Sequence, residues 1–402
     1  MDKKSSKQPR LVVFSTLFPN PGQPNAGVFI RERMFRVGKH VPIIVVAPVA
    51  WFPGQSIIRY FKPHFRPDTP FKEVQEGVTV YHPRFFSIPF FFKCLDGYFL
   101  ALSSFKIMKK LKKEFNYNII DSHFAYPDGF AATRLGKWLS VPVTITLRGT
   151  EVPHSKSISK RPLLLMALKS AKKVFSVSTS LKNHVVKLGA QEEKITVVGN
   201  GVDIEKFYPV NGNELRNKLG IKETDKILIT IGALVERKGF HRIIEIMPDL
   251  MRTSPELHYL VVGGAGVEGD WSEKLKSQVY DFQLQNNVHF LGAMLPAELK
   301  KVLSAADIFV LSTRNEGWAN VILEAMACGL PVIATDVGGN SEVISNQDIG
   351  KVIPFDEPIA LKNAINEALE KKWNRQIIIQ YAKDNSWTKR VKLLIAEFEK
   401  LI

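Results

Sequence analysis

The sequence has few of the residues on which several common kinds of protein depend. Its 402 residues contain two cysteines, Cys94 and Cys328, which stand far apart and without metal-ligand spacing. A disulfide framework is therefore not expected, and this scarcity is typical of a reducing cytoplasm. Asp-x-Asp and Cys/His clusters are absent, so the sequence offers no evident metal ligands. We expect neither a bound metal nor a cofactor.

Long apolar runs are also missing. The longest strongly apolar stretch, residues 41–52, contains prolines and is too short to span a bilayer. The basic first ten residues are not followed by the apolar core of a signal peptide. A Walker loop and a G-x-S-x-G elbow are absent too, which excludes two common catalytic motifs. These absences favour a cytoplasmic, globular protein, and the length predicts two domains.

The net positive charge is confined to the first half of the chain. Residues 1–205 hold 31 Lys and Arg against 14 Asp and Glu, whereas residues 206–402 hold 24 against 25. A one-sided positive field attracts anionic surfaces, so nucleic acid and an anionic membrane are both candidate partners. A nucleic-acid-binding protein would also need a basic and aromatic platform or a recognition motif, and the sequence shows neither.

Strands, polar loops and helices alternate along the chain, twice over. The pattern predicts strands over 11–14, 43–47, 78–81, 119–123, 143–147, 174–177 and 195–198, and again over 227–231, 259–262, 288–291, 308–311, 332–334 and 351–353. A turn-rich segment, 199–213, divides the two series. We therefore expect an N-terminal domain over 1–203 and a C-terminal domain over 204–384. A helix over about 385–402 is expected to pack back on the first domain.

This alternation defines an α/β fold class with two Rossmann-like domains. Ligands of such domains bind beyond the carboxyl ends of the parallel strands. We expect the two domains to face each other across a deep cleft.

The richest stretch runs over residues 313–339. It reads as strand, polar loop, helix and strand, with Glu316 on the loop and Glu324 in the helix. Asn320 is a candidate helix cap, and the helix start between the two carboxylates favours anions. Two glutamates near a helix start are also common on solvated helices, because negative charge suits that end of the dipole. The stretch alone therefore does not establish a site.

A second loop supplies positive charge. Arg237 and Lys238 follow the first strand of the second domain, where two cations and free helix amides can hold a diphosphate. The later G-x-G-x-x-G run beginning at Gly264 follows the second strand, not the first, so dinucleotide binding is not favoured. We interpret Gly264 as part of a turn that lets a ligand approach the backbone.

Polar residues also follow the strands of the first domain. His123 ends the strand over 119–123, and Arg148 and Glu151 follow the strand over 143–147. Gly27, in the opening loop, would allow close backbone approach. Each of these residues also has a purely structural interpretation, because polar groups at a sheet edge are often just hydrogen-bonded within the fold.

In combination these segments resemble retaining glycosyltransferase family 4. The resemblance is carried by G-A-L-V-E-R-K-G, N-E-G-W-A-N-V-I-L-E-A-M-A-C-G-L-P, H-F-A-Y-P-D-G and F-P-N-P-G-Q-P-N-A-G, and it covers nearly the whole chain. The opening segment is similar to that of bacterial enzymes of exopolysaccharide and teichuronic acid assembly. The resemblance implies the GT-B fold, with a nucleotide sugar bound between the domains.

The resemblance also implies roles for individual residues. Glu324 would hold the ribose hydroxyls and Glu316 the transferred sugar, while Arg237 and Lys238 would bind the diphosphate and stabilise it as it leaves. The remaining donor-binding positions are the amides near Ala319, Asn320 and Val321, with Gly27 touching the diphosphate and His123 lying beside the donor sugar. Glu342 would give structural support.

Two positions depart from the family pattern. Trp318-Ala319-Asn320 stands where Phe-Gly-Leu is frequent, so we expect a different sugar pocket. Arg148 stands where a histidine is frequent, which leaves the roles of Arg148 and Glu151 open; we assign them provisionally to the acceptor.

The implied activity is metal-independent transfer of a sugar from a nucleotide-diphosphate sugar to a saccharide acceptor, with retention of configuration. The implied setting is bacterial cell-surface polysaccharide biosynthesis. A nucleotide-sugar epimerase with the same fold is an alternative, and it would isomerise the free donor without an acceptor.

One further segment concerns the acceptor. Residues 84–93 form an aromatic-rich segment that begins with Arg84, ends with Lys93 and includes Phe90, Phe91 and Phe92. The run and its Pro89 suggest a loop that is either core or inserted into a membrane interface. With the nearby Lys109, Lys110 and Lys113, it is a candidate docking face for the anionic inner leaflet. A lipid-linked saccharide is the acceptor that this hypothesis predicts.

Overall fold

The computed structural model describes residues 8–24, 26–61, 65–89, 91–266 and 268–402. The chain divides into two compact units. Unit 1 comprises Met1–Gly199 together with Arg390–Ile402, and unit 2 comprises Asn200–Lys389. The chain passes from one unit to the other after Gly199 and after Lys389, a few residues away from the boundaries predicted after residues 203 and 384.

Unit 1 is built on one mostly parallel sheet with the strand order β10-β9-β8-β7-β1-β2-β5-β4. Only β4 runs antiparallel, at the edge. The central strands are buried along their whole length, as strands covered by helices on both faces must be. The strands are β1 (Leu11–Phe14), β2 (Ile43–Val46), β4 (Lys72–Gln75), β5 (Val78–Tyr81), β7 (Ile119–His123), β8 (Val143–Leu147), β9 (Lys173–Ser176) and β10 (Ile195–Val197).

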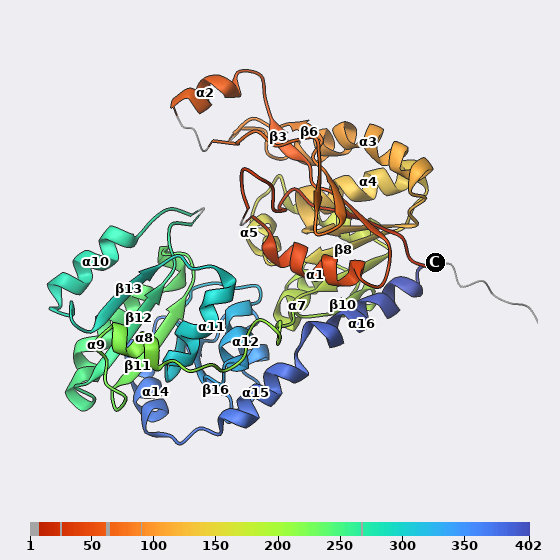
Figure 1. The fold of residues 1–402 in the computed structure, drawn as a ribbon. Coiled ribbons are helices and arrows are strands. Elements are labelled where there is room, and N and C mark those ends of the chain that lie inside the picture. The colour runs from red at the N-terminus through yellow and green to blue at the C-terminus, as the bar shows by residue number, and fades with distance from the viewer. Residues whose placement is uncertain (1–7, 25, 62–64, 90, 267) are drawn as a thin grey trace, which may run out of the picture. The chain divides into compact units, whose positions relative to one another are not determined.

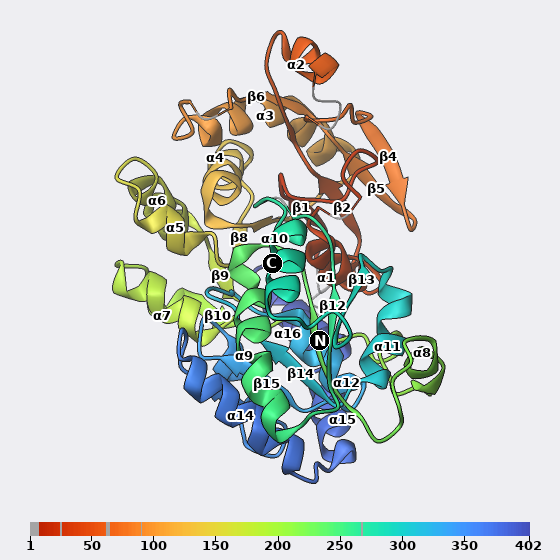
Figure 2. The same cartoon turned by 90° about the vertical axis from the view of Figure 1, so that its left-hand side faces the viewer.

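Most helices of unit 1 flank this sheet, and one, residues 55–61, lies away from it (Figure 1). They are α1 (Val28–Gly38), α2 (Gln55–Phe61), α3 (Asp96–Glu114), α4 (Phe130–Leu139), α5 (Glu151–Ser155), α6 (Arg161–Ser170) and α7 (Thr179–Lys187). A cis peptide joins Tyr126 to Pro127 in the turn before α4. Both views place α3 beside α4 (Figures 1 and 2).

A small ribbon extends this unit beyond the main sheet. It pairs β3 (Val49–Trp51) with β6 (Arg84–Phe86), and α2 lies close to it (Figure 2). The expectation of a loop over 84–93 is therefore wrong for its first three residues. Backbone pairing with β3 orders them, and Phe85 is buried. Sequence reasoning missed β3, β4 and β6. The strands β3 and β6 are too short to show a periodic pattern, and β4 is an edge strand with the polar sequence Lys-Glu-Val-Gln.

The last helix, α16 (Trp387–Glu399), completes the core of unit 1. Val391, Leu394 and Phe398 recur at helical spacing on one buried face, where they pack with residues of β1, β2 and α1. The Phe398 ring lies 5.6 Å from the ring of Phe175, with an edge-on geometry. Residues 390–402 are thus part of the first unit's core.

Unit 2 has a parallel sheet with the order β13-β12-β11-β14-β15-β16. One apolar cluster joins one face of the sheet to α9, α10 and α14, and a second joins the opposite face to α11, α12 and α15 (Figure 1). The elements are α8 (Asn213–Lys218), β11 (Lys226–Ile231), α9 (Phe240–Thr253), β12 (Leu257–Val262), α10 (Ser272–Asp281), β13 (Val288–Gly292), α11 (Pro296–Ala305), β14 (Ile308–Leu311), α12 (Asn320–Ala327), β15 (Val332–Thr335), α13 (Asn340–Val343), β16 (Gly350–Ile353), α14 (Pro358–Glu370) and α15 (Arg375–Asp384).

The two segments that leave unit 2 are joined to each other. The Val202 amide donates to the Asn385 carbonyl at 3.2 Å, and the Trp387 amide donates to the Val202 carbonyl at 3.2 Å. A Cβ on Gly201 would lie 2.5 Å from the Trp387 nitrogen, so only glycine permits this approach. The two stretches of chain that connect unit 2 to unit 1 are therefore hydrogen-bonded to each other where they leave unit 2.

Candidate functional site

The candidate site of unit 2 lies at the carboxyl ends of four adjacent strands, β12, β11, β14 and β15. The loop after β11 carries Arg237 and Lys238 in a 3₁₀ turn over Glu236–Lys238. The loop after β14 carries Glu316, and the loop after β12 carries Glu268. Parallel strands bring these three loops to one edge, as the strand and loop pattern predicts.

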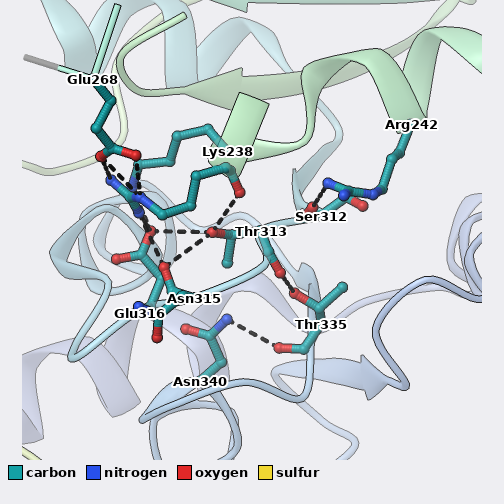
Figure 3. Close-up of polar contacts among 10 residues, drawn as sticks. Lys238, Arg242, Glu268, Ser312, Thr313, Asn315, Glu316, Thr335 and Asn340 are labelled. Atoms are coloured by element: carbon teal, nitrogen blue, oxygen red, sulfur yellow. Dashed lines mark hydrogen bonds and ion pairs between the residues drawn. The ribbon is translucent and has the colours of Figure 1, made fainter. Parts of the chain in front are cut away.

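Glu316 is paired with both cations of the neighbouring loop (Figure 3). Its Oε1 lies 2.5 Å from Lys238 Nζ and 3.3 Å from Arg237 Nη1. Arg237 Nη1 also donates to the Asn315 carbonyl at 3.0 Å. The three side chains are only 11–24% exposed, so the ion pairs are partly shielded from solvent. The structure thus brings together three of the predicted donor-binding residues.

A second carboxylate holds Arg237 from the other side. Arg237 Nε donates to Glu268 Oε1 and Oε2 at 2.9 and 3.1 Å, and Nη2 donates to Oε1 at 2.7 Å. This forked pairing lowers the pKa of Glu268. Burial opposes the charge on Arg237, but the two carboxylates outweigh it and raise the pKa of the guanidinium. Sequence reasoning missed Glu268, although it lies within the glycine-rich run.

Hydroxyl and amide groups brace these loops against one another (Figure 3). Thr313 Oγ1 donates to the Arg237 carbonyl at 3.0 Å, and the Thr335 hydroxyl donates to the Thr313 carbonyl at 2.5 Å. Asn340 Nδ2 donates to the Thr335 carbonyl at 3.0 Å. Thr313, Thr335 and Asn340 are buried, so the bracing lies beneath the charged groups.

Two glycines allow the close approach of these loops. A Cβ on Gly239 would lie 1.8 Å from the Ser312 carbonyl oxygen, and one on Gly338 would lie 1.5 Å from that of Glu316. Both residues have positive φ, of 78° and 57°. Gly264 has no such constraint, because its Cβ would only contact the side chain of Ala293 at 3.4 Å. In the β12 loop the constrained glycine is Gly263, whose Cβ would lie 1.7 Å from the Gly232 carbonyl.

The helix after the Glu316 loop begins differently from our expectation. The residue preceding α12 is Ala319, and Asn320 is the first helical residue. Asn320 does not cap the helix; its Oδ1 accepts from Asn200 Nδ2 at 2.9 Å. Val321 and Glu324 follow in α12, where both are partly exposed.

Trp318 lies just before this helix. Its side chain packs against the core cluster beneath α12. The indole Nε1 is buried and has no hydrogen-bond partner in the described part of the chain. Glu342 lies in α13 and is partly buried.

A separate group of predicted residues comes together in unit 1. His123 is the last residue of β7, and Arg148 directly follows β8. The strands β7 and β8 are paired. Arg148 Nε donates to His123 Nδ1 at 3.1 Å, and the Arg148 guanidinium lies over the Phe29 ring at 4.9 Å. Phe29 is in the first turn of α1, directly after Gly27. Gly27 has a φ of 66°, and a Cβ there would lie 2.3 Å from the Leu17 carbonyl.

Glu151 has a structural role that the sequence did not reveal. It is fully buried, with Oε1 accepting from the Ala125 amide at 3.0 Å and Oε2 from the amides of Arg148 and Gly149 at 3.1 and 2.8 Å. The carboxylate therefore ties the loop after β7 to the loop after β8. Such a position leaves it no surface on which to meet an acceptor.

The residues predicted to dock on a membrane are partly on the surface. Phe91 and Phe92 are 66% and 67% exposed, while Phe90 lies outside the described residues. Lys109, Lys110 and Lys113 are exposed on α3. The exposed apolar side chains near them in sequence are Leu95, Tyr98 and Leu102. Among the described residues, none of the helices is both long enough and apolar enough to cross a bilayer.

A polar cavity of about 320 Å³ lies within unit 1. Its lining combines cations, carboxylates, amides and the Trp51 ring, with Arg66, Arg84, Lys93, Asp96, Asn20, Gln23 and Gln55 among the residues. Gln55 is 6% exposed, and its Oε1 has no hydrogen-bond partner in the described part of the chain. Within the part of the chain that the structure describes, no group of three or more His, Cys, Asp or Glu side chains could hold a metal ion.

Comparison with known proteins agrees with this architecture. The model of the family "Glycosyl transferases group 1" matches residues 211–385, and that of "Glycosyltransferase Family 4" matches residues 59–206. The chain is therefore a glycosyltransferase with the GT-B type of fold, built from two Rossmann-like domains. The chain thus contains one domain that matches each of these two models.

Relatives with curated names share the activity class. The chain is 27% identical over 348 residues to TuaC of Bacillus subtilis, which is named as a glycosyltransferase of teichuronic acid biosynthesis. This match covers 83% of this chain and 82% of that protein. It is 29% identical over 256 residues to N-acetyl-alpha-D-glucosaminyl L-malate synthase of Bacillus anthracis, covering 63% of this chain and 65% of that protein.

Solved structures share the fold. Anabaena Alr3699/HepE in complex with UDP superposes with a TM-score of 0.74 at 19% identity, covering 97% of this chain and all of that chain. An E. coli structure titled for trehalose-6-phosphate and bound with UDP-2-fluoro glucose gives 0.73 at 11% identity, covering 98% and 99%.

Proposed function

We propose that the chain transfers a sugar from a nucleotide-diphosphate sugar to a saccharide acceptor with retention of configuration and without a metal. The observation that carries the proposal is the cluster of Lys238, Arg237 and Glu316 at the carboxyl edge of the unit 2 sheet. Two cations that already hold a carboxylate can exchange it for the oxygens of a diphosphate. The UDP and UDP-glucose named for Alr3699/HepE support a UDP-sugar as the donor.

The two cations explain how the chemical step is accelerated. When the bond to the sugar breaks, negative charge develops on the departing diphosphate, and Lys238 and Arg237 stabilise it in place. Their charge takes the part that a divalent cation plays in other transferases. Glu316, released from Lys238, is then free to accept hydrogen bonds from the hydroxyls of the sugar, and Glu324 from those of the ribose.

We assign the acceptor to the cavity of unit 1. Its Trp51 ring offers a stacking surface for a sugar, and its amides, cations and carboxylates can pair with hydroxyl and anionic groups. TuaC is named for teichuronic acid biosynthesis, which supports a polysaccharide setting for this chain. The cavity replaces Glu151 as our candidate for acceptor recognition, because the Glu151 carboxylate is fully used within the fold.

A peripheral position on the inner face of the cell membrane would deliver a lipid-linked acceptor. Phe91 and Phe92 are exposed aromatic residues next to a helix that presents several exposed lysines. Aromatic rings insert at the bilayer interface, and lysines are attracted by anionic headgroups.

The donor assignment is tested by thermal stabilisation. Wild-type protein is melted with UDP-, GDP- and ADP-sugars in the presence of EDTA. We expect one nucleotide class to raise the melting temperature, and Lys238→Ala to abolish that rise. The matched control is Lys276→Ala, which replaces an exposed lysine of α10 that pairs with Glu273. An unchanged response in Lys238→Ala would remove the diphosphate assignment.

Retention and transfer are tested on the product. The donor that stabilises the protein is incubated with the protein and a saccharide acceptor, and the anomeric configuration of the new linkage is read by NMR. The α-linked donor should give an α-linked product. Inverted product, or activity lost with EDTA and restored by Mg²⁺, would contradict this part of the proposal.

A further inference from the structure

Three cations and two carboxylates line the polar cavity of unit 1. Asp68 Oδ1 lies 3.7 Å from Arg84 Nη2, and Asp68 Oδ2 is paired with Arg59 Nη1. Asp96 Oδ2 lies 3.2 Å from Lys93 Nζ. Both carboxylates of the lining are therefore already paired with cations that the chain itself supplies.

Arg66 is the third cation of the lining. Its Nη1 donates to the Ser87 carbonyl at 2.7 Å, and its guanidinium lies 5.6 Å from the centroid of the Phe52 ring and 5.6 Å from that of the Phe65 ring. Among the described residues, no carboxylate forms an ion pair with Arg66. Burial lowers the pKa of this guanidinium, and Asp96 opposes the shift. The guanidinium is thus held in place while its charge remains available to a ligand.

A buried amide adds an unused hydrogen-bond acceptor to the same cavity. Gln55, the first residue of α2, is 6% exposed and belongs to the lining. Its Oε1 has no hydrogen-bond partner in the described part of the chain. Because a buried acceptor without a donor costs free energy, a hydroxyl that enters the cavity gains by donating to it. The cavity therefore offers a cation, an acceptor for a hydroxyl and the ring of Trp51 to one ligand.

The charge balance of the lining indicates which anion it suits. Three cations against two carboxylates leave a single positive charge, which a monoanion neutralises. A phosphate monoester carries about −1.5 to −2 charges and would face Asp68 and Asp96 with the excess. A guanidinium also matches a planar carboxylate through two parallel N–H bonds. Among the described residues, Nε and Nη2 of Arg66 make no hydrogen bond, so this edge can form such a fork.

We propose that the acceptor held in this cavity is a saccharide that carries a carboxylate, of the uronic acid class. Arg66 binds the carboxylate, and Gln55 Oε1 accepts from a hydroxyl of the sugar. The proposal rests on the proposed function, because it takes this cavity as the acceptor site, and it adds the chemical class of the acceptor. The residues that carry it all belong to unit 1, so binding alone can test it without a donor.

The class of acceptor is tested by ligand-observed NMR on the full chain without nucleotide. The ligands are the methyl glycosides of glucuronic, galacturonic and mannuronic acid. Each is paired with the neutral hexoside that has a hydroxymethyl group in place of the carboxylate. At least one uronate should bind about tenfold or more tightly than its neutral counterpart, because hydrogen bonds to an ionised group are the stronger ones. Uronates that bind no better than their counterparts would overturn the proposal.

Arg66→Gln tests the residue that we assign to the carboxylate. The variant should bind the preferred uronate about tenfold more weakly, while its affinity for the neutral counterpart changes by less than about twofold. Arg66→Lys keeps the charge but cannot form the fork, so it should retain only part of the preference. Arg161→Gln, which replaces an exposed arginine of α6, is the matched control and should bind both glycosides like wild type. Equal weakening of both glycosides in Arg66→Gln would refute the assignment.

Gln55→Leu separates a role in binding from a role in the fold. Since Oε1 has no partner in the described part of the chain, its removal should not lower the melting temperature. The variant should nevertheless bind the uronate and the neutral glycoside about threefold or more weakly, because both ligands carry the hydroxyl. A lower melting temperature with unchanged binding would contradict the role of Gln55.

Two further measurements separate the remaining possibilities. Methyl glucoside 6-phosphate is titrated beside the uronates, and tighter binding of this phosphate than of every uronate would overturn the choice of a carboxylate. Transfer is then followed with the nucleotide sugar that raises the melting temperature, and the preferred uronate should be glycosylated. Failure of every nucleotide to bind would count against the proposed function itself. Nucleotide binding together with transfer to neutral glycosides in preference to uronates would overturn this inference alone.

Discussion

Lys238 Nζ lies 2.5 Å from Glu316 Oε1, so the cation assigned to the diphosphate and the carboxylate assigned to the sugar are bonded to each other. Arg237 shares the same carboxylate oxygen at 3.3 Å and is also forked to Glu268. The donor site is therefore internally neutralised, and a diphosphate must compete with carboxylates that the chain itself supplies. Binding is consequently an exchange of ion pairs.

Glu268→Gln should strengthen UDP binding. Glu268 is 45% exposed, so the pairing with Arg237 contributes up to about 1 kcal/mol, and its removal should tighten binding by up to about fivefold. Isothermal titration measures the Kd for UDP. Glu273→Gln, an exposed glutamate of α10 paired with Lys276, is the control and should leave the Kd unchanged. Weaker binding in Glu268→Gln would show that Glu268 supports the site.

Gly338→Ala should damage the donor site indirectly, by displacing the loop that carries Glu316. The new Cβ would lie 1.5 Å from the Glu316 carbonyl oxygen, so the Glu316 loop must shift. We expect the Kd for UDP to rise at least about tenfold, or about 1.4 kcal/mol. Gly77→Ala is the matched control, because Gly77 has a φ of 83° and an added Cβ would meet nothing within 4 Å. It should cost about 1 kcal/mol of stability and leave UDP binding intact. Equal Kd values for the two variants would contradict the loop argument.

Asp128 and Asp121 should each contribute a part of the stability of unit 1 that falls as the pH rises through the weakly acidic range. Burial raises the pKa of Asp128 to about 7 from 3.8, and that of Asp121 to about 6. Each of these two carboxyls therefore holds its proton more tightly in the folded chain than in the unfolded chain, so its contribution to the free energy of unfolding decreases from about pH 4 up to its folded pKa and levels off above it. The histidines whose pKa burial lowers, such as His123, contribute with the opposite sign. Each group contributes up to about 1.4 kcal/mol per pH unit within its own window.

Asp128→Asn tests this assignment, because asparagine does not titrate. Asn Oδ1 can still accept from the Thr16 amide, which Asp128 Oδ1 binds. As the pH rises from 4 to 7, the melting temperature of the variant should fall less, or rise more, than that of wild type. Asp348→Asn, at an exposed loop position, should show the wild-type pH dependence. Identical slopes for wild type and Asp128→Asn would refute the raised pKa.

Membrane docking should depend on Phe91 and Phe92. Replacing both by serine removes two exposed rings and should lower binding to anionic vesicles at least about tenfold in a flotation assay. High salt should weaken the binding of wild type, because the lysines of α3 contribute electrostatically. The control is Tyr280→Ser in unit 2, an aromatic residue that is 71% exposed. No flotation of wild type at low salt would end the hypothesis.

Much of the fold could be predicted because its strands are unbroken apolar runs. β1 and β14 are apolar throughout and entirely buried, and such runs between polar loops indicate parallel strands covered on both faces. The short elements could not be predicted in this way. β3 and β6 exist because they pair with each other, a long-range contact that leaves no periodic pattern. Asn320 likewise fits the composition of a cap, but its bond to Asn200 is invisible in the sequence.

The candidate site likewise contains residues that the sequence predicts and residues that it does not. Arg237, Lys238 and Glu316 could be placed together, because adjacent strand ends must meet. Glu268 and Glu151 could not be assigned, since their roles depend on which backbone or side-chain partner lies opposite. His123 illustrates the limit most clearly, because its partner Arg148 comes from a strand that is adjacent in the sheet but 25 residues away in the chain.

Helix α16 has a consequence for the order in which the chain is made and folded. Val391, Leu394 and Phe398 belong to the core of unit 1, yet they are synthesised after the whole of unit 2. During translation unit 2 can fold first, while the apolar residues of unit 1 that α16 covers are still exposed to solvent. The first half of the chain would then need protection from aggregation for as long as the second half takes to emerge. Residues 390–402 therefore complete the core of unit 1 only after unit 2 has been synthesised.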